Sequence, residues 1–259
     1  MDISFIGEQI VLFIAGFTAN ILAALSGGGA GFVQLPVLIF MGLNFSLALG
    51  THKVAVVALG LGSFTKNHSL SSLNKAIALQ MLFIGGPAVA LGSYIVIFFS
   101  DFWAELVLGL ITIACVIYSY CKKEFGIENK SHLLTTKDYI IGGILVALTG
   151  LLSGSFSSGA GLVAIMVLVL FFKLDIKTAI HHSMVFVALI WNLIGAITIG
   201  SLGQIQWDWV PMLVLGAFLG GFTGTLLVKK CQTKFIKYLF QSVMVISGVL
   251  LLYKAYTHF

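Results

Sequence analysis

Charged side chains are scarce in this chain. Only 9% of its 259 residues carry a charge, whereas 59% are hydrophobic and the mean hydropathy is +1.08. A water-soluble core of ordinary size cannot hide that much apolar surface. The composition therefore predicts an integral membrane protein, with the lipid bilayer as a partner.

Carboxylates are missing from the middle of the apolar stretches. All nine acidic residues lie in predicted loops or near segment ends: Asp2, Glu8, Asp101, Glu105, Glu124, Glu128, Asp138, Asp175 and Asp208. A cation carrier or pump usually needs a mid-membrane carboxylate to replace the hydration shell of the ion or to relay protons. Their absence disfavours a cation as the cargo and favours an anion.

The chain also lacks the signatures of catalysis. Its three cysteines, Cys115, Cys121 and Cys231, have neither metal nor disulfide spacing. No nucleophile and base pair, phosphate loop or dinucleotide fingerprint is present. The lysines sit in short loops and do not form a basic face with interleaved aromatic residues. We therefore expect no enzyme activity, no cofactor, no metal and no nucleic-acid partner.

What the chain does contain is a series of long apolar stretches. Five of them, each near the length that spans about 30 Å of hydrocarbon, run over residues 77–100, 103–121, 176–200, 209–228 and 235–253. The first 25 residues carry Asp2 and Glu8 where a signal peptide has a basic patch, so we interpret them as a retained segment. The expected fold is all-α and multi-pass, in the cell membrane, with a bacterial inner membrane as the expected location.

A glycine-rich break occurs twice. The run Ser-Gly-Gly-Gly-Ala-Gly at residues 26–31 returns as Ser-Ser-Gly-Ala-Gly at residues 157–161, about 130 positions later. The same shift aligns Leu82 with Leu213 and Gly85 with Gly216. Each copy then has five apolar segments, which in the first copy cover residues 8–25, 29–43, 46–66, 76–100 and 103–121. We predict two repeats, residues 1–121 and 138–259, joined by a connector at 122–137.

The lysines predict that the two repeats have opposite orientations, because short cytoplasmic loops are enriched in Lys and Arg. The loop at residues 100–102 has no lysine, whereas its counterpart carries Lys229, Lys230 and Lys234. The preceding loop shows the reverse, with lysines only in the first copy. An odd number of crossings per copy, or three crossings plus a re-entrant hairpin, gives such inverted repeats. The alternative is an old duplication whose halves have lost any functional symmetry.

Lys53 is the lysine that falls inside an apolar segment. It lies about 10 Å into the predicted helix, at 1.5 Å per residue, which is too deep for easy snorkelling to the surface. A buried ammonium there favours an anionic ligand. The alternative is that Lys53 reaches a water-filled vestibule or caps carbonyls of the broken helix.

Two histidines flank the glycine breaks. His52 precedes Lys53, and His182 occupies the corresponding place in the second copy. Each is a candidate for contact with the substrate or for carrying a proton near neutral pH. The alternative is a hydrogen-bonded packing role, which is also the role we expect for the lone amides Asn20 and Asn192.

The breaks themselves offer backbone N–H groups. If short helices begin at Gly29 and Gly159, the positive ends of their dipoles can point at an anion near the membrane midplane. The flanking residues Ser26, Gly27, Gly28, Ser157 and Ser158 would supply further donors. Close helix packing is the alternative use of glycine, and it fits Gly142, Gly143, Gly216, Gly220 and Gly221 better.

These motifs resemble the TauE/SafE family of membrane transporters over nearly the whole chain. Members similarly carry a glycine-rich first motif followed by a proline, as in residues 28–36, and then an Ala-x-x-Thr stretch, as in residues 48–51. The resemblance implies an all-helical permease of two inverted repeats that moves sulfite, sulfonates or related anions, usually outward. The triplet at 51–53 looks closest to a branch with Thr-Asn-Lys there; the second copy has His-Ser-Met at 182–184, without the lysine.

We therefore expect a secondary carrier of a small anion, with sulfite or an organosulfonate as the leading cargo and a site near the midplane. The alternatives are an anion channel and, less favoured, a membrane assembly factor or enzyme. The oligomeric state stays open, with a homo-oligomer as one option. The candidate substrate-binding residues are Gly28, Gly29, Gly31, Thr51, His52, Lys53, Ser158, Gly159, Gly161 and His182.

Overall fold

The structure is a computed structural model that describes residues 3–66, 73–96, 101–121, 126, 129, 131 and 134–257. Within these residues the fold is all-helical, without strands. The helices are α1 (Ile3–Ser26), α2 (Ala30–Phe40), α3 (Phe45–Lys66), α4 (Lys75–Gln80), η2 (Met81–Gly85), α5 (Gly86–Ile95), α6 (Asp101–Cys121), α7 (Thr136–Phe156), α8 (Ala160–Leu170), α9 (Ile176–His182), η5 (Ser183–Trp191), α10 (Asn192–Gly200), η6 (Trp207–Trp209), α11 (Val210–Lys230) and α12 (Thr233–Thr257).

The membrane prediction is confirmed by helix length and composition. Among the described residues, seven helices are long and apolar enough to cross a bilayer: Phe5–Ser26, Phe45–Lys66, Lys75–Ile95, Thr136–Phe156, Ile176–Gly200, Trp207–Lys230 and Thr233–Tyr253. The five predicted long stretches fall on helices, apart from residues 97–100, which lie outside the described part of the chain. The chain is therefore a multi-pass membrane protein.

Each glycine run ends one helix and starts a short one. Gly29, with φ of 96°, is the N-cap of α2, and Gly159, with φ of 78°, is the N-cap of α8. A side chain at such positive φ would be strained, so glycine is the residue that permits the turn. Both following helices are only 11 residues long. The prediction that short helices begin at these glycines is confirmed.

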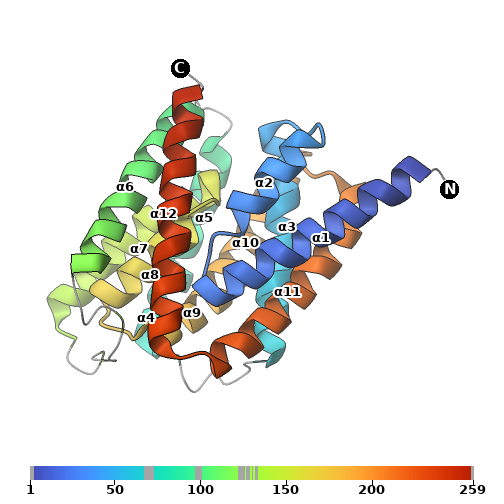
Figure 1. Cartoon of the computed structure of the whole chain (residues 1–259). Helices are drawn as coiled ribbons and strands as arrows, with labels where there is room; N and C mark the ends of the chain where they lie inside the picture. Colours follow the sequence, from blue (N-terminus) through green and yellow to red (C-terminus); the bar gives the residue numbers. More distant parts are fainter. Residues whose placement is uncertain are drawn as a thin grey trace.

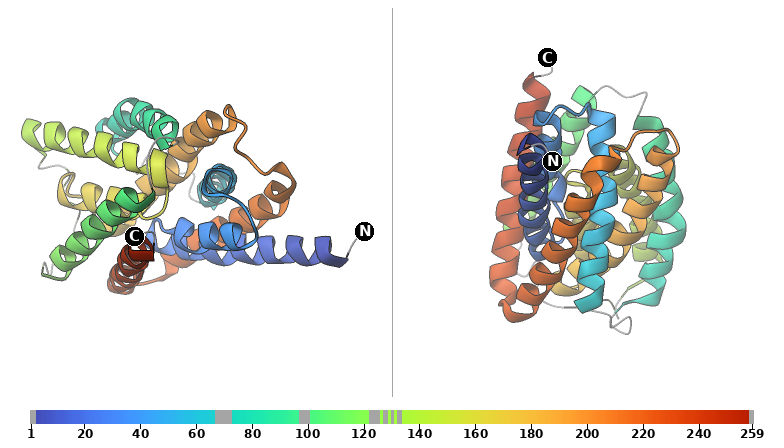
Figure 2. Two further views of the ribbon diagram at one scale, coloured as in Figure 1. Left: turned by 90° about the horizontal axis from the view of Figure 1, so that it is seen from above. Right: turned by 90° about the vertical axis from the view of Figure 1, so that its right-hand side faces the viewer.

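Helix α3 packs against α1, α2, η5, α10 and α11. Helix α1 lies along α11, α5 along α7, and α6 along α12. Figure 2 shows α3 running through the molecule between α1 and α10. Small residues allow the closest approaches: a Cβ at Gly216 would lie 2.5 Å from the carbonyl oxygen of Phe13, and one at Gly154 would overlap the carbonyl oxygen of Val89.

The lysine-bearing helix ends lie together. Lys229 Nζ donates to the carbonyl of Lys66 at 2.9 Å, Lys177 Nζ donates to that of Cys231 at 2.7 Å, and Lys173 pairs with Asp138 at 2.8 Å. In Figure 1 the α11–α12 connection and α4 lie at the lower end, whereas the C-terminus and the α2–α3 connection lie at the upper end. Residues 67–72 and most of the connector from 122 to 133 lie outside the described residues.

Candidate functional site

The two glycine breaks cross in the interior of the protein. A Cβ at Gly28 would lie 2.9 Å from the carbonyl carbon of Gly161, and one at Gly31 would lie 2.5 Å from Ser158 Oγ. Neither position has room for a side chain, because its neighbour is backbone or a buried hydroxyl. The structure therefore brings together Gly28, Gly31, Ser158 and Gly161, which come from opposite halves of the chain.

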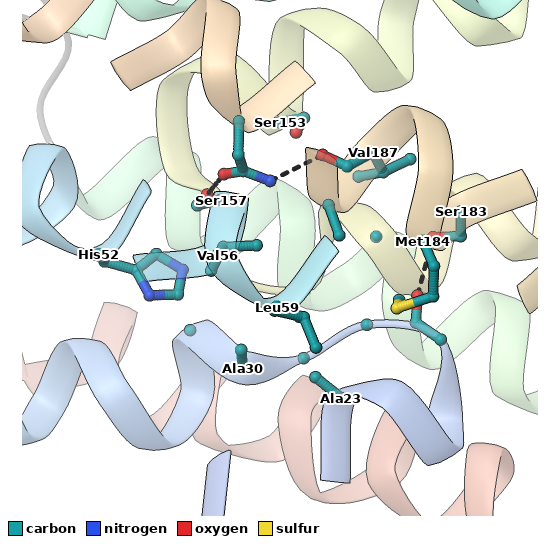
Figure 3. Close-up of a pocket in the computed structure, with 17 residues that line it drawn as sticks. Ala23, Ala30, His52, Val56, Leu59, Ser153, Ser157, Ser183, Met184 and Val187 are labelled. Atoms are coloured by element: carbon teal, nitrogen blue, oxygen red, sulfur yellow. Dashed lines mark hydrogen bonds between the residues drawn. The ribbon is translucent and has the colours of Figure 1, made fainter. Parts of the chain in front are cut away.

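A small polar cavity of about 30 Å³ lies at this crossing (Figure 3). Its walls come from α1, α2, α3, α7, α8, η5 and α10. The lining residues are Ala23, Gly27, Gly28, Gly29, Ala30, Gly31, His52, Val56, Leu59, Ser153, Ser157, Gly161, Ser183, Met184, Val187, Ala188 and Asn192. A cavity of this volume has room for about two water molecules.

Two helix N-termini meet at this crossing without side-chain caps. Neither Gly29 nor Gly159 is accompanied by a capping side chain. The first amides of the two helices, those of Ala30 and Gly31 in α2 and of Ala160 and Gly161 in α8, have no acceptor within their own helices. Each helix start carries a partial positive charge of roughly half a unit. The arrangement can therefore bind an anion with backbone donors from both halves.

Lys53 stands behind one wall of the cavity. Its side chain is fully buried, and Nζ donates to the carbonyl of Ser153 at 2.7 Å and to Ser157 Oγ at 3.3 Å. Ser157 Oγ in turn donates to Asn192 Oδ1 at 3.3 Å. The ammonium thus caps the C-terminal end of α7, where helix carbonyls favour a cation. It is one hydroxyl group removed from the cavity.

The charge of Lys53 has no buried carboxylate beside it. The buried polar and charged side chains of the described residues are Asn, Ser, Gln, Thr, His and Lys, without Asp or Glu. Taking an ion out of water is costly unless an opposite charge or several hydrogen bonds replace the water. The site is therefore electropositive.

His52 reaches the cavity from α3. Its Nδ1 lies 3.0 Å from Gln34 Oε1, so the amide oxygen accepts a hydrogen bond from Nδ1–H. This leaves Nε2, 3.3 Å from the position of a Cβ at Gly31, as an acceptor or a second N–H toward the crossing. Gln34, fully buried on α2, is a residue that the sequence reasoning missed. A lone amide inside an apolar segment is the signal that could have revealed it.

Thr51 and His182 lie elsewhere. Thr51 Oγ1 accepts from the Gln206 amide at 2.9 Å and holds the segment after α10 against α3. His182 Nδ1–H donates to the carbonyl of Thr178 at 2.9 Å, and Nε2 accepts from the Asn74 amide at 3.1 Å. Both ring nitrogens of His182 are engaged, and neither residue lines the cavity.

Three polar lining residues, Ser153, Ser183 and Asn192, were not predicted as part of a site. Ser183 Oγ donates to the carbonyl of Gly27 at 2.8 Å and so fixes the first break. Asn192 Nδ2 donates to the carbonyl of Val187 at 2.8 Å, at the end of the π-helical segment η5. Ser153 supplies the carbonyl that receives Lys53. After Ser183 the sequence of η5 is apolar, with no proline or glycine to mark the π-helix.

Membrane-length helices that enclose a polar cavity between two broken helices define a membrane transporter. The chain belongs to the family described as "Sulfite exporter TauE/SafE", which matches residues 12–251. Membership confirms the predicted resemblance and places the chain among transporters and not enzymes.

Curated relatives support the same class. The chain is 25% identical to "Probable membrane transporter protein YunE" of Bacillus subtilis (strain 168), over 95% of this chain and 97% of the relative. It is 26% identical to a "Probable membrane transporter protein" of Haemophilus influenzae, over 88% of each. It is 23% identical to "Probable membrane transporter protein YfcA" of Escherichia coli (strain K12), over 95% and 90%. No solved structure matches the chain.

Proposed function

We propose that the protein is a secondary carrier of a small oxyanion, with sulfite or an organosulfonate as the leading cargo, which binds between the two glycine breaks. The observation that carries the proposal is that Gly29 and Gly31, at the uncapped start of α2, and Gly161, in the uncapped first turn of α8, line one buried cavity. Free amides and helix dipoles at such ends favour negative charge. The family description, which names a sulfite exporter, agrees with this cargo.

The proposed ligand contacts are the amides at Gly28, Gly29, Gly31, Gly159 and Gly161, with Ser158 beside them. His52 faces the same cavity and adds a donor when it is protonated. Lys53 contributes its charge through Ser157 and the end of α7. Thr51 and His182, by their hydrogen bonds, hold the surrounding helices in place.

The inverted-repeat arrangement belongs to this proposal, with repeats at 1–121 and 138–259. It is supported by the packing of the helices, because equivalent helices of the two repeats pack against equivalent helices of the opposite repeat. Helix α1 packs against α11, and its counterpart α7 packs against α5, the counterpart of α11. Helices α6 and α12, which are counterparts, pack against each other. This symmetric exchange of partners supports two inverted repeats, the arrangement from which alternating access is built in many carriers.

A carrier fits the cavity better than a channel does. The cavity has a volume of about 30 Å³, which holds about two water molecules. This volume is too small for a hydrated anion. The helices must separate for the anion to enter, so transport would be saturable and slow. A negative-inside potential drives a monoanion outward by about 2.3 kcal/mol per 100 mV, so export needs no coupling ion.

The test is flux in proteoliposomes with sulfite, methanesulfonate, sulfate and acetate as the offered anions. We expect saturable flux of sulfite or methanesulfonate, exceeding that of acetate, and dependence on an imposed potential. Continuous single-channel conductance in bilayer recordings would select the channel instead. Absence of flux for all four anions would contradict the proposed function.

A further inference from the structure

An apolar pocket of about 300 Å³ lies beside the central cavity and shares Gly31 with it. The pocket is formed by α2 along its whole length, the start of α3, the end of α7 with Ser158 beyond it, and the C-terminal part of α12. Its lining residues used below are Gly31, Phe40, Ser158, Leu250 and Tyr253. We call it the side pocket.

The side pocket has a polar inner end and an apolar outer end. Gly31 and Ser158, which meet at the crossing of the breaks, lie at its inner end. Phe40 and Tyr253, at the other end, are 91% and 66% exposed on the surface of the bundle. A molecule that fills it would therefore have its charged group at the glycine breaks and its apolar part between α2 and α12.

We infer that the side pocket binds the apolar portion of the transported anion, so that the preferred substrates are sulfonates or similar oxyanions that carry a short alkyl chain or a ring. This inference rests on the proposed function of the central site. The pocket is about ten times larger than the central cavity, and a dry apolar cavity of about 150 Å³ suffices for benzene. Because Gly31 lines both cavities, a molecule in the side pocket lies directly beside the central site, which favours a substrate over an unrelated lipid chain.

The test compares two anions with the same head group, methanesulfonate and 1-butanesulfonate, on the full chain in lipid nanodiscs. Binding is measured as ligand-induced thermal stabilisation, with empty nanodiscs as the control for partitioning. Burial of each methylene group strengthens binding roughly threefold to fourfold, so butanesulfonate should bind about 40-fold more tightly than methanesulfonate.

The variant Leu250→Trp should remove this preference. Leu250 lines the pocket and is half-exposed, so a larger side chain there fills the pocket without disturbing the core. We expect unchanged methanesulfonate binding and a chain-length ratio below about threefold, which is less than one buried methylene group provides. The matched control is Val249→Trp on the same helix, because Val249 is exposed and does not line the pocket.

The outcomes separate this inference from the proposed function. If neither anion stabilises the protein, the central anion site is wrong. If methanesulfonate binds but the two affinities are equal, or if Leu250→Trp keeps the wild-type ratio, only the side-pocket inference is overturned. A third outcome is that the two affinities are equal and that native mass spectrometry detects a co-purifying lipid which the Leu250→Trp variant lacks. This outcome would assign the pocket to a lipid chain and would also overturn the side-pocket inference.

Discussion

At the scale of single residues, Lys53 is the main source of positive charge at the site. Its Nζ donates to a helix-end carbonyl and to a hydroxyl, and the described buried residues supply no carboxylate. These neutral partners replace only part of the water that the ammonium loses. An anion in the adjoining cavity would supply the opposite charge that the ammonium of Lys53 lacks.

Lys53→Met should therefore weaken anion binding. Two unit charges about 4 Å apart interact by about 4 kcal/mol at an effective dielectric constant of about 20, and by less at the longer distance across Ser157, so we expect a roughly 10-fold to 100-fold loss of affinity for sulfite or methanesulfonate. Lys53→Arg should retain part of the binding because the charge persists. The measurement is ligand-induced thermal stabilisation. Lys177→Met is the matched control, since Lys177 also donates to a carbonyl but lies at the lysine-bearing end. Undiminished stabilisation of Lys53→Met would make Lys53 purely a cap of α7.

Gly29→Val tests the backbone of the first break. A valine at φ of 96° is strained by about 1–3 kcal/mol, and its side chain crowds the N-terminus of α2. We expect flux to be lost while expression is largely kept, as judged by the yield of protein that elutes as a single species. Gly42→Val is the control, because Gly42 has a similar φ of 108° with open space around it. Wild-type flux in Gly29→Val would show that this glycine serves packing alone.

At the scale of helices, close backbone approach determines which elements can lie side by side. Lipid tails are as apolar as leucine, so helices associate through packing and hydrogen bonds and not through water exclusion. The π-helical segments take part: Trp191 of η5 donates from Nε1 to the carbonyl of Met81 in η2 at 2.7 Å. Trp191 also occupies the space over Gly85, which leaves no room for a Cβ there.

The contact between α1 and α11 gives a prediction at this scale. A Cβ at Gly16 would lie 3.0 Å from the carbonyl oxygen of Leu213, whereas one at Gly7, on the same helix, has nothing within 4 Å. Gly16→Val should cost about 1–3 kcal/mol of stability by overpacking, and Gly7→Val should cost little. Thermal unfolding in nanodiscs measures the difference. Equal melting temperatures for the two variants would mean that α1 and α11 separate without cost.

At the scale of the whole molecule, hydrogen bonds join the lysine-bearing ends of α3, α9 and α11 at one end of the bundle. The positive-inside rule assigns this end to the cytoplasm. The segment after α10, which contains Gly203, is fixed at the opposite end through Thr51 and Gln206. The breaks lie between these two ends, where a substrate site open to each side in turn is needed.

Thiol labelling tests this orientation. Cys121 is exposed and Cys231 is half-buried, and both stand at helix ends. An impermeant maleimide added to intact cells should leave Cys121 and Cys231 unmodified. When the native cysteines are replaced by serine, the same reagent should label a cysteine introduced at Gly203 or Asp101. Permeabilised cells provide the control. External labelling of Cys231 with Gly203→Cys protected would reverse the orientation and contradict the lysine argument.

The sequence was enough to predict the membrane helices, the two breaks and the family. Apolar runs of spanning length have few alternative structures, because a backbone in lipid must satisfy its own hydrogen bonds. Clustered glycines at matching positions in the two repeats then indicate breaks in the transmembrane helices, and such breaks must be buried in protein or line a polar cavity. Gly28, Gly29, Gly31, Gly159, Gly161 and Lys53 were predicted as site residues in this way, since each stands out from its apolar neighbours.

The partners of these residues were decided only by the tertiary structure. Lys53 bonds to the end of α7, about 100 residues away, and His182 bonds to Asn74 at the start of α4. The sequence showed two histidines in equivalent places, yet only His52 reaches the cavity. The direction in which a helical side chain points depends on the rotation of the helix about its axis. A helix that is apolar on all sides has no amphipathic pattern from which that rotation can be predicted.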